Sequence, residues 1–498
     1  MIEPCDLSAT EARAMIRSKE LSPVELLESC LRRTDDTNSA LNAVVTRVDE
    51  MAMDDARRKE QEVIDGVPLG PLHGLPVAIK DLQPTSGILT TYGSEYFADH
   101  IPDADSGIVR RVRTSGGVIT GKTNIPEMSI GANTVNRLFG ATGNPFDPAK
   151  TCGGSSGGSA VAVAVGMAAL ATGSDHGGSL RIPACYSGVV GHRSSPGLVP
   201  HELRTITQTN YSLQGPMGRT VADAALLLAA LAQRDNSSRL DPMCFPLDSS
   251  VFCNLKEVDI GNLRVGVSTD LGGVLVSKSI RESFEERVSF LSKHVAVLSE
   301  VDVDLTDAPA VDWQLRADVF ATQYHREIDN YDGGINPNIR NSYETALSTD
   351  VLAIAKARRR QMELFQEFTT QFENFDLIIC PGVSVPPFKW TSLYPEEIDG
   401  RAVENYMAWL ALSSALTVVG NPVTALPCGF DLNGTPFGIQ CIGPMFEDHA
   451  LLSNAAAIEQ LFSVEELTAR PIPDVAWLKN QISAVSYTHL TLPTNREV

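Results

Sequence analysis

The chain has 498 residues, of which 43% are hydrophobic and 20% are charged, and its formal net charge is −21. This composition excludes an intrinsically disordered chain, which would hold fewer hydrophobic residues, and a small scaffold held together by disulfides. The excess of acidic residues argues against binding of nucleic-acid phosphates, because such binding requires a basic surface.

The N-terminal segment, MIEPCDLSATEARAM, lacks the basic and apolar regions of a signal peptide. The longest apolar stretch, residues 160–172, is too short to cross a bilayer. The nine cysteines are scattered without a C-x-x-C pair, and no His/Cys cluster has metal-ligand spacing. We therefore expect a cytoplasmic protein with reduced thiols that has no membrane partner, no nucleic-acid partner and no metal.

Helical and strand patterns alternate along most of the chain. Residues 5–65 are predicted to be helical, and one helix should begin at Ser22-Pro23, with Ser as the N-cap and Pro in the first turn. A buried strand is predicted at 75–79 (LPVAI), directly before Lys80. Residues 159–170 alternate like a strand, but their length and alanine content favour a tightly packed helix.

The second half of the chain continues this alternation. A helix is predicted at 278–294, and strands are predicted at 263–267, 377–380, 423–426 and 437–442. No composition shift marks a domain boundary. The pattern favours one large α/β sheet with helices on both faces.

Residues 116–123 (GGVITGKT) match the phosphate-binding pattern G-x-x-x-x-G-K-[ST]. A P-loop requires a strand before the first glycine and a helix at the lysine. Here the strand-forming Val118-Ile119 lies inside the pattern, and Pro126 would interrupt the helix. A nucleotide-binding protein that uses Lys122 is therefore the weakest alternative.

Residues 154–158 (GSSGG) match G-x-S-x-G, the nucleophile elbow of α/β-hydrolases. An elbow follows a hydrophobic strand, whereas residues 147–152 (DPAKTC) are not expected to form a strand. No histidine has a context that marks it as a triad member. The elbow interpretation is therefore weak.

Two Gly-Gly-Ser turns, with Ser155 and Ser179 lying 24 residues apart, flank the predicted small-residue helix. A helix that leaves and a strand that returns could bring these turns face to face. Glycines permit close packing and positive φ angles. Packing alone explains neither the serine after each glycine pair nor Lys80 at the end of a buried strand.

Taken together, these motifs resemble the amidase signature family. The resemblance runs in order through residues 74–81 (GLPVAIKD), 121–124 (GKTN), 153–158 (GGSSGG), 175–183 (DHGGSLRIP), 420–423 (GNPV), 426–430 (LPCGF) and 434–440 (GTPFGIQ). It implies a single α/β/α sandwich with a large mixed central sheet. It also implies an amidase domain over 1–484 with its core at about 70–200, and amide hydrolysis through an acyl-enzyme without a cofactor.

Carried over by position, the resemblance implies a Ser-cisSer-Lys triad. Ser179 would be the nucleophile, Ser155 the relay on a cis peptide after Gly154, and Lys80 the base. A serine hydroxyl requires a base within hydrogen-bonding distance. Lysine can serve only when neutral, so burial must lower its pKa from about 10.4 towards 7–8.

The resemblance also implies an oxyanion hole formed by the backbone amides of His176, Gly177, Gly178 and Ser179, where glycines let the amides converge. A further expectation is that Asp175 and Arg181 pair and hold this turn.

Three departures from the family pattern leave the pocket shape open. His176 stands where a small or aliphatic residue is usual, Cys152 replaces proline, and His-Arg-Ser at 192–194 replaces Leu-Lys-Pro. The His176 side chain either contacts substrate or is packed. We expect residues 127–133 and the region after 200 to line the pocket.

The expected substrate is a small molecule with an apolar or aryl amide, and carbamates (urethanes) and esters are further candidates because the same tetrahedral chemistry serves them. The family also contains the glutaminase subunit of the tRNA-dependent amidotransferase. That subunit usually has glutamine where this chain has Ile182, which favours a stand-alone amidase. A homodimer would suit the family.

The last stretch, residues 485–498, has no counterpart in the family. It resembles the translated sequencing adapter found in metagenomic gene models. We expect a non-native or disordered tail there.

Overall fold

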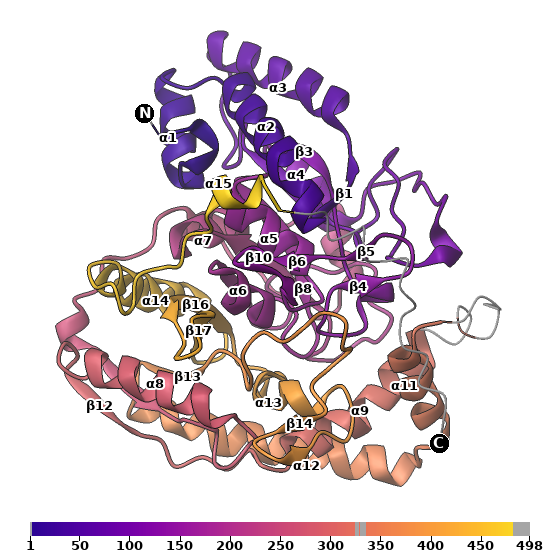
Figure 1. Ribbon diagram of the computed structural model, residues 1–498, viewed down its shortest axis with the longest axis vertical. Coiled ribbons are helices and arrows are strands. Elements are labelled where there is room, and N and C mark those ends of the chain that lie inside the picture. The colour runs from indigo at the N-terminus through magenta and orange to yellow at the C-terminus, as the bar shows by residue number, and fades with distance from the viewer. Residues whose placement is uncertain (1, 324–327, 329–334, 482–498) are drawn as a thin grey trace.

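The computed structural model describes residues 2–323, 328 and 335–481. An 11-stranded mixed sheet runs through it, with helices packed around the sheet (Figure 1), which confirms the predicted fold class. In sheet order the strands are β1 (Val44–Arg47), β3 (Val118–Thr123), β2 (Pro76–Lys80), β8 (Leu170–Asp175), β10 (Leu213–Gly218), β9 (Val190–Arg193), β16 (Val423–Phe430), β17 (Pro436–Ile442), β13 (Leu377–Pro381), β11 (Arg264–Val267) and β12 (Val297–Glu300).

The direction of neighbouring strands determines which residues meet at one edge of the sheet. Strand β2 lies between β3 and β8 and is parallel to both, whereas β8 and β10 are antiparallel. Parallel neighbours end at the same edge. Lys80, the last residue of β2, and Asp175, the last residue of β8, therefore lie close to one another at that edge.

The helices cover the sheet on both faces. In chain order they are α1 (Ala9–Ser18), α2 (Pro23–Leu41), α3 (Asp49–Ile64), α4 (Gly107–Thr114), α5 (Gly157–Val165), α6 (Arg181–Ser187), α7 (Val221–Leu231), α8 (Lys278–Leu291), α9 (Ala308–Gln323), α11 (Pro337–Ser348), α12 (Val351–Thr369), α13 (Ala411–Val419), α14 (Asp448–Phe462) and α15 (Val475–Leu478).

Two adjacent residues of strand β9 show that helices cover both faces of the sheet. A Cβ on Gly191 would lie 3.2 Å from Ala184 of α6, whereas the adjacent His192 contacts Asp448 of α14 at 3.2 Å. Successive strand residues point to opposite faces of a sheet. Helices α6 and α14 therefore lie on opposite faces, which gives the predicted α/β/α sandwich.

The helix predicted at 159–170 is shorter than expected. Helix α5 ends at Val165 because Gly166 adopts a left-handed conformation with φ 84°, and β8 already begins at Leu170. Left-handed glycines commonly terminate helices. The apolar run thus belongs to a buried helix and then to a buried strand, which periodicity alone does not distinguish.

A second correction concerns residues 147–152. They were not expected to form a strand, yet β7 (Asp147–Thr151) pairs with β6 (Gly143–Asn144) in a separate two-stranded sheet. Two other short pairs are β4 (Val135–Asn136) with β5 (Gly140–Ala141), and β14 (Glu397–Ile398) with β15 (Arg401–Ala402). Because β7 is outside the central sheet and mostly not buried, it does not provide the strand of a nucleophile elbow.

Residues 5–65 were predicted to be helical, but Val44–Arg47 form β1, which pairs with β3 at the edge of the central sheet. Its run Val-Val-Thr consists of β-branched residues, which favour a strand.

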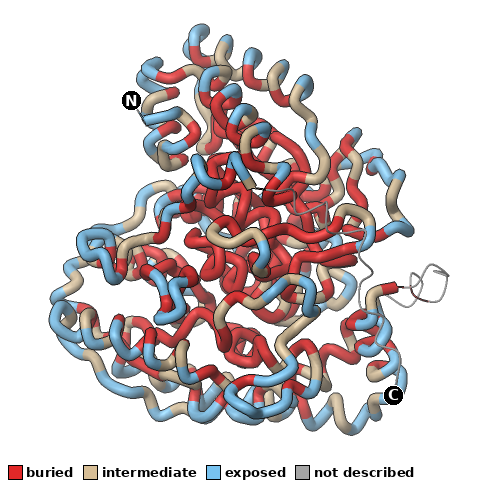
Figure 2. Tube along the Cα trace, in the orientation of Figure 1, coloured by how far each residue is buried: buried red, intermediate tan, exposed pale blue. Residues whose placement is uncertain are grey.

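The other predicted elements agree with the structure to within a few residues. Helix α2 begins at Pro23, and the Ser22 side chain and Glu25 form a capping box. Figure 2 shows that buried residues concentrate in the middle of the molecule, around β8 and α5. The predicted tail at 485–498 lies outside the described residues.

Two further expectations concern the whole chain. All nine cysteines are free thiols, as their scattered positions indicated. Within the described ranges, no helix has both the length and the apolar character needed to cross a membrane.

Candidate active site

Lys80 ends the buried strand β2 and is itself 0% exposed. Its Nζ lies within hydrogen-bonding distance of three serine hydroxyls, those of Ser155 at 2.7 Å, Ser156 at 2.9 Å and Ser174 at 2.8 Å. Burial lowers the pKa of Lys80 to about 7, although Asp175 opposes this shift. A large fraction of Lys80 is therefore neutral near pH 7.

The hydrogen bonds around Lys80 favour proton exchange with a serine. A protonated lysine has three N–H donors, one for each hydroxyl oxygen. The Ser156 hydroxyl donates to the Ser174 carbonyl at 3.2 Å, so its oxygen accepts from Lys80. When Lys80 loses a proton, its lone pair can accept from Ser155 or Ser174. The cluster can thus take a proton from a serine without a large rearrangement.

The two Gly-Gly-Ser turns meet as the sequence predicted. The Ser156 amide, just before α5, donates to the Ser179 carbonyl, just before α6, at 3.2 Å. The Gly154–Ser155 peptide bond is cis. Ser155 is buried, whereas Ser179 is partly exposed. Ser179 is therefore the more accessible of these two hydroxyls.

Ser156 and Ser174 were not predicted as partners of Lys80. Ser174 could have been found from the alternation of β8, because Thr172 and Ser174 face the same side of the strand. Thr172 also contacts Lys80, since its hydroxyl oxygen accepts from the Lys80 amide at 3.1 Å. Ser156 follows Ser155 directly, but only the folded turn reveals that both hydroxyls reach the same lysine.

Asp175 organises the turn that carries Ser179. The predicted pair with Arg181 is present at 3.0 Å, and Arg193 adds a second ion pair at 3.3 Å. Burial would raise the pKa of Asp175, but the two guanidinium groups lower it well below its usual value. Asp175 therefore stays ionised and also accepts from the amides of Gly178 and Leu180.

These contacts change the set of amides available to an oxyanion. The Gly178 amide, expected in the oxyanion hole, donates to Asp175 Oδ1 at 2.9 Å instead. The amides of His176, Gly177 and Ser179 have no acceptor among the described residues. Three of the four predicted donors thus remain free to bind a ligand oxygen.

We expect Asp175→Asn to lower the free energy of unfolding by about 3–5 kcal/mol, because it leaves buried Arg181 and Arg193 without a counter-charge. Urea unfolding followed by circular dichroism measures this change. Glu363→Gln is the control, since it removes an exposed partner of Arg359 and should cost less than about 1 kcal/mol. Equal effects of the two substitutions would contradict the structural role of Asp175.

The comparisons with known proteins agree with this geometry. The family model described as Amidase matches residues 25–452. The chain belongs to the amidase signature family. It is 31% identical to an acylamidase of Rhodococcus erythropolis over 91% of this chain and 95% of the relative. It is also 30% identical to one of the subunits of the glutamyl-tRNA(Gln) amidotransferase of Carboxydothermus hydrogenoformans, over 93% of this chain and 99% of the relative.

A solved structure shares the fold of this amidase over most of its length. The crystal structure of a bacterial aryl acylamidase of the amidase signature family superposes with a TM-score of 0.83 at 25% identity, covering 91% of this chain and 96% of that chain. Family membership and these relatives make this protein an amide hydrolase.

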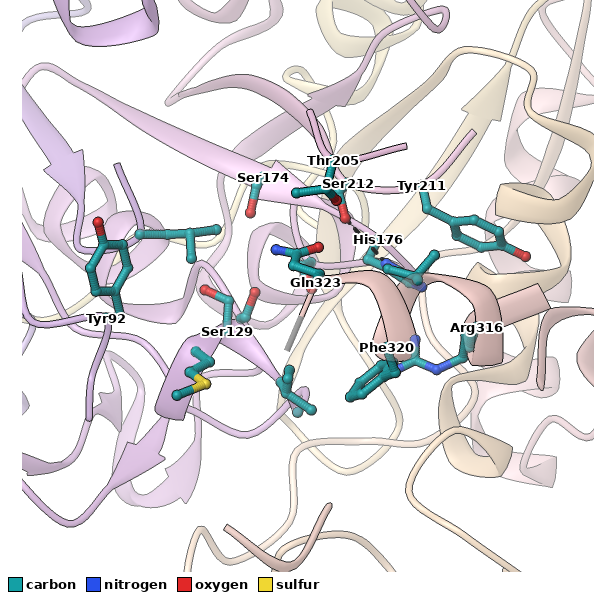
Figure 3. A pocket seen from close by; sticks show the side chains of 18 of the residues that line it. Tyr92, Ser129, Ser174, His176, Thr205, Tyr211, Ser212, Arg316, Phe320 and Gln323 are labelled. Carbon is teal, nitrogen blue, oxygen red and sulfur yellow. Dashed lines mark hydrogen bonds between the residues drawn. The ribbon is translucent and has the colours of Figure 1, made fainter. Parts of the chain in front are cut away.

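A cavity of about 500 Å³ lies against the serines of this amidase, and Ser155, Ser174 and Ser179 form part of its wall. Figure 3 shows Tyr92 and Ser129 at one end, and His176, Arg316 and Phe320 at the other. Much of the wall is apolar or aromatic, from Tyr92, Phe97, Met128, Ile130, Ile182, Leu203, Ile206, Val319, Phe320, Met407 and Leu410.

The segments expected to line the pocket do so. Residues 128–132 belong to the predicted loop, and several residues between 201 and 214 come from the region after residue 200. Sequence reasoning missed the contribution of α9, which supplies Arg316, Val319, Phe320 and Gln323. No motif marks α9, because its residues reach the cavity only through tertiary packing.

His176 is both packed and in the cavity wall. Its ring stacks on Tyr211 with centroids 4.4 Å apart, and Nδ1 lies 3.3 Å from the Ser212 hydroxyl. Burial and nearby Arg316 hold the pKa of His176 well below its usual value, so the ring is neutral. This ring therefore shapes the cavity without adding charge.

The nucleotide-binding interpretation of Lys122 is wrong. Lys122 lies inside strand β3, where a P-loop would require a loop and a helix start. Its Nζ is buried and donates to the Gln83 carbonyl, to Thr85 Oγ1 at 2.9 Å and to Thr90 Oγ1 at 3.0 Å. Lys122 is a structural residue in the strand that pairs with β2, the strand that carries Lys80.

Proposed function

We propose that this amidase hydrolyses small amides with Ser179 as nucleophile, Ser155 as proton relay and Lys80 as base. The observation that carries the proposal is the buried Lys80, with a pKa near 7, in contact with Ser155 at the wall of the cavity that Ser179 also lines. A neutral lysine in hydrogen-bonding contact with a hydroxyl is suited to general base catalysis.

In this mechanism Ser179 Oγ forms a bond to the amide carbonyl carbon. Its proton passes to Ser155 Oγ as the Ser155 proton passes to Lys80 Nζ. The tetrahedral oxyanion accepts from the free amides of His176, Gly177 and Ser179. The C–N bond then breaks, and the amine leaves with the proton returned through Ser155. A water molecule hydrolyses the resulting ester by the same steps, which regenerates Ser179.

The cavity wall supports apolar or aryl groups on the substrate. A ligand that covers its aromatic and aliphatic side chains removes them from water, which lowers the free energy of the complex. Ile182, next to Arg181 of the catalytic turn, adds to this apolar surface. Carbamates and esters are further proposed substrates, because their carbonyl carbons pass through the same tetrahedral geometry.

We propose that the enzyme acts without a different partner protein, either as a single chain or as a homodimer. Its free thiols suit a reducing cytoplasmic compartment. The second candidate is a glutaminase component of an amidotransferase, which the 30% identity to an amidotransferase subunit favours. Ile182 supports the first candidate, since it offers glutamine no hydrogen bond from its side chain.

The test is hydrolysis of matched 4-nitroanilide, aryl carbamate and aryl ester substrates, with glutamine as the fourth substrate, by the isolated wild-type chain. We expect activity on the nitroanilide or the carbamate and little on glutamine. Activity on glutamine alone, or only after addition of amidotransferase subunits, would favour the second candidate instead.

A further inference from the structure

Arg316 of α9 is a buried cation in the cavity wall, with 6% of its surface exposed. Its Nη2 donates to the Tyr406 hydroxyl, and its guanidinium lies 5.1 Å from the centre of the Phe320 ring. Its Nε has no hydrogen-bond partner, and no carboxylate of the described residues lies within 4 Å of the guanidinium. A buried arginine normally has a paired anion.

The rest of the cavity provides no counter-charge. Its described wall holds no aspartate or glutamate, and its other arginine, Arg204, is already paired with Asp241 at 3.1 Å. Burial lowers the pKa of His201 to about 4, so that ring is neutral near pH 7. Among the described residues of the cavity wall, Arg316 is therefore the permanently charged side chain that has no counter-ion.

Asp312, one helical turn before Arg316, is the competing acidic group. It is fully buried, and neither of its carboxylate oxygens accepts a hydrogen bond from Arg316. It forms no ion pair with Arg316 within 4 Å, and it does not line the cavity. Asp312 therefore reduces the field of Arg316 from a distance but accepts no hydrogen bond from its N–H groups, of which Nε–H has no partner among the described residues.

We propose that Arg316 binds a carboxylate on the substrate, remote from the amide bond that is cleaved. This inference rests on the proposed function, because it assigns a substrate class to the same cavity. A guanidinium donates two parallel hydrogen bonds to a carboxylate. A chain with net charge −21 otherwise repels anions, so a dedicated cation is required to hold one. The substrate thus combines an apolar body with an acidic group.

Two matched substrate pairs test this inference. The acyl-side pair is glutaryl and 5-methylhexanoyl 4-nitroanilide, in which two methyl groups replace the carboxylate oxygens. The amine-side pair is the acetyl amides of 4-aminobenzoate and 4-isopropylaniline. In at least one pair we expect the wild type to have the higher kcat/KM for the substrate that carries the carboxylate. Arg316→Met should lower the ratio of the two kcat/KM values by about 10- to 100-fold.

Two variants separate recognition from packing. Arg316→Lys keeps the charge but loses the planar fork, so it should retain part of the preference. Arg264→Gln is the control, because Arg264 pairs with Asp376 at the protein surface and does not line the cavity, so the ratio should stay within about threefold. Calorimetric binding of the glutaryl substrate to Ser179→Ala, with and without Arg316→Met, gives a readout that does not depend on turnover.

The possible outcomes distinguish this inference from the proposed function. Preference for the neutral member of both pairs, or equal ratios in wild type and Arg316→Met, would overturn the carboxylate site and leave the amidase mechanism intact. Inactivity towards all four substrates would count against the proposed function, while the calorimetric comparison would still decide the role of Arg316. If Arg316→Met does not fold, the substrate ratios and the calorimetric binding are measured with Arg316→Gln, which removes the charge, and with Arg316→Lys, which keeps it.

Discussion

Ser179→Ala is expected to lower kcat for amide hydrolysis by at least about 10⁴-fold, because it removes the atom that forms the acyl-enzyme. Release of 4-nitroaniline measures the rate. A fluorophosphonate probe followed by intact-protein mass spectrometry should label the wild type once and leave Ser179→Ala unlabelled. The loss should occur in kcat, since the apolar cavity wall that binds the substrate is retained.

Ser155→Ala and Ser156→Ala are the matched controls, because both serines contact Lys80 but differ in their proposed role. Ser155→Ala should also be severely impaired, since it interrupts the proton path. Ser156→Ala should be less affected, because its hydroxyl is fully buried and donates to the Ser174 carbonyl. If Ser179→Ala kept its activity and its label, the nucleophile would lie elsewhere, and Ser155, which also lines the cavity, would be the next candidate.

Lys80→Met is expected to lower kcat/KM by about 10²–10⁴-fold, the range typical of general base catalysis. Burial lowers the pKa of Lys80 to about 7, and only the neutral amine accepts a proton. Wild-type kcat/KM should therefore fall about tenfold per pH unit below about pH 7 and level off above it. Lys80→Met should lose this acid limb, so the pH profile distinguishes loss of the base from general damage.

Lys122→Met is a matched control, because Lys122 is also a buried lysine whose pKa is lowered, to about 8, by burial against the opposing effect of Asp81. Lys122 does not line the cavity, so the acid limb should stay at the wild-type pH in this variant. Thermal unfolding checks that both variants fold. An acid limb that survives in Lys80→Met would refute the assignment of Lys80 as the base.

Much of the fold could be predicted from local sequence. The apolar run before Lys80, the capping residues of α2 and the apolar segments at 377–380 and 437–442 indicated buried strands and helices at their observed positions. Prediction failed where the sequence pattern fits both a buried helix and a buried strand. The helix predicted at 159–170 ends at Val165, and Leu170 already begins β8, because this run is apolar and buried on all sides and its periodicity does not separate a helix from a strand.

The motifs alone determined that Lys80, Ser155, Ser179 and the Asp175–Arg181 pair belong to one site, because their spacing and order resemble one family. Tertiary structure alone decided how many serines reach Lys80, which amide Asp175 occupies, and that Arg316 of α9 faces the same cavity. Such contacts join residues that are far apart in the sequence. They therefore produce no local periodicity or turn motif from which they could be predicted. Burial then sets the charge state of Lys80, since desolvation depends on every element packed around the end of β2.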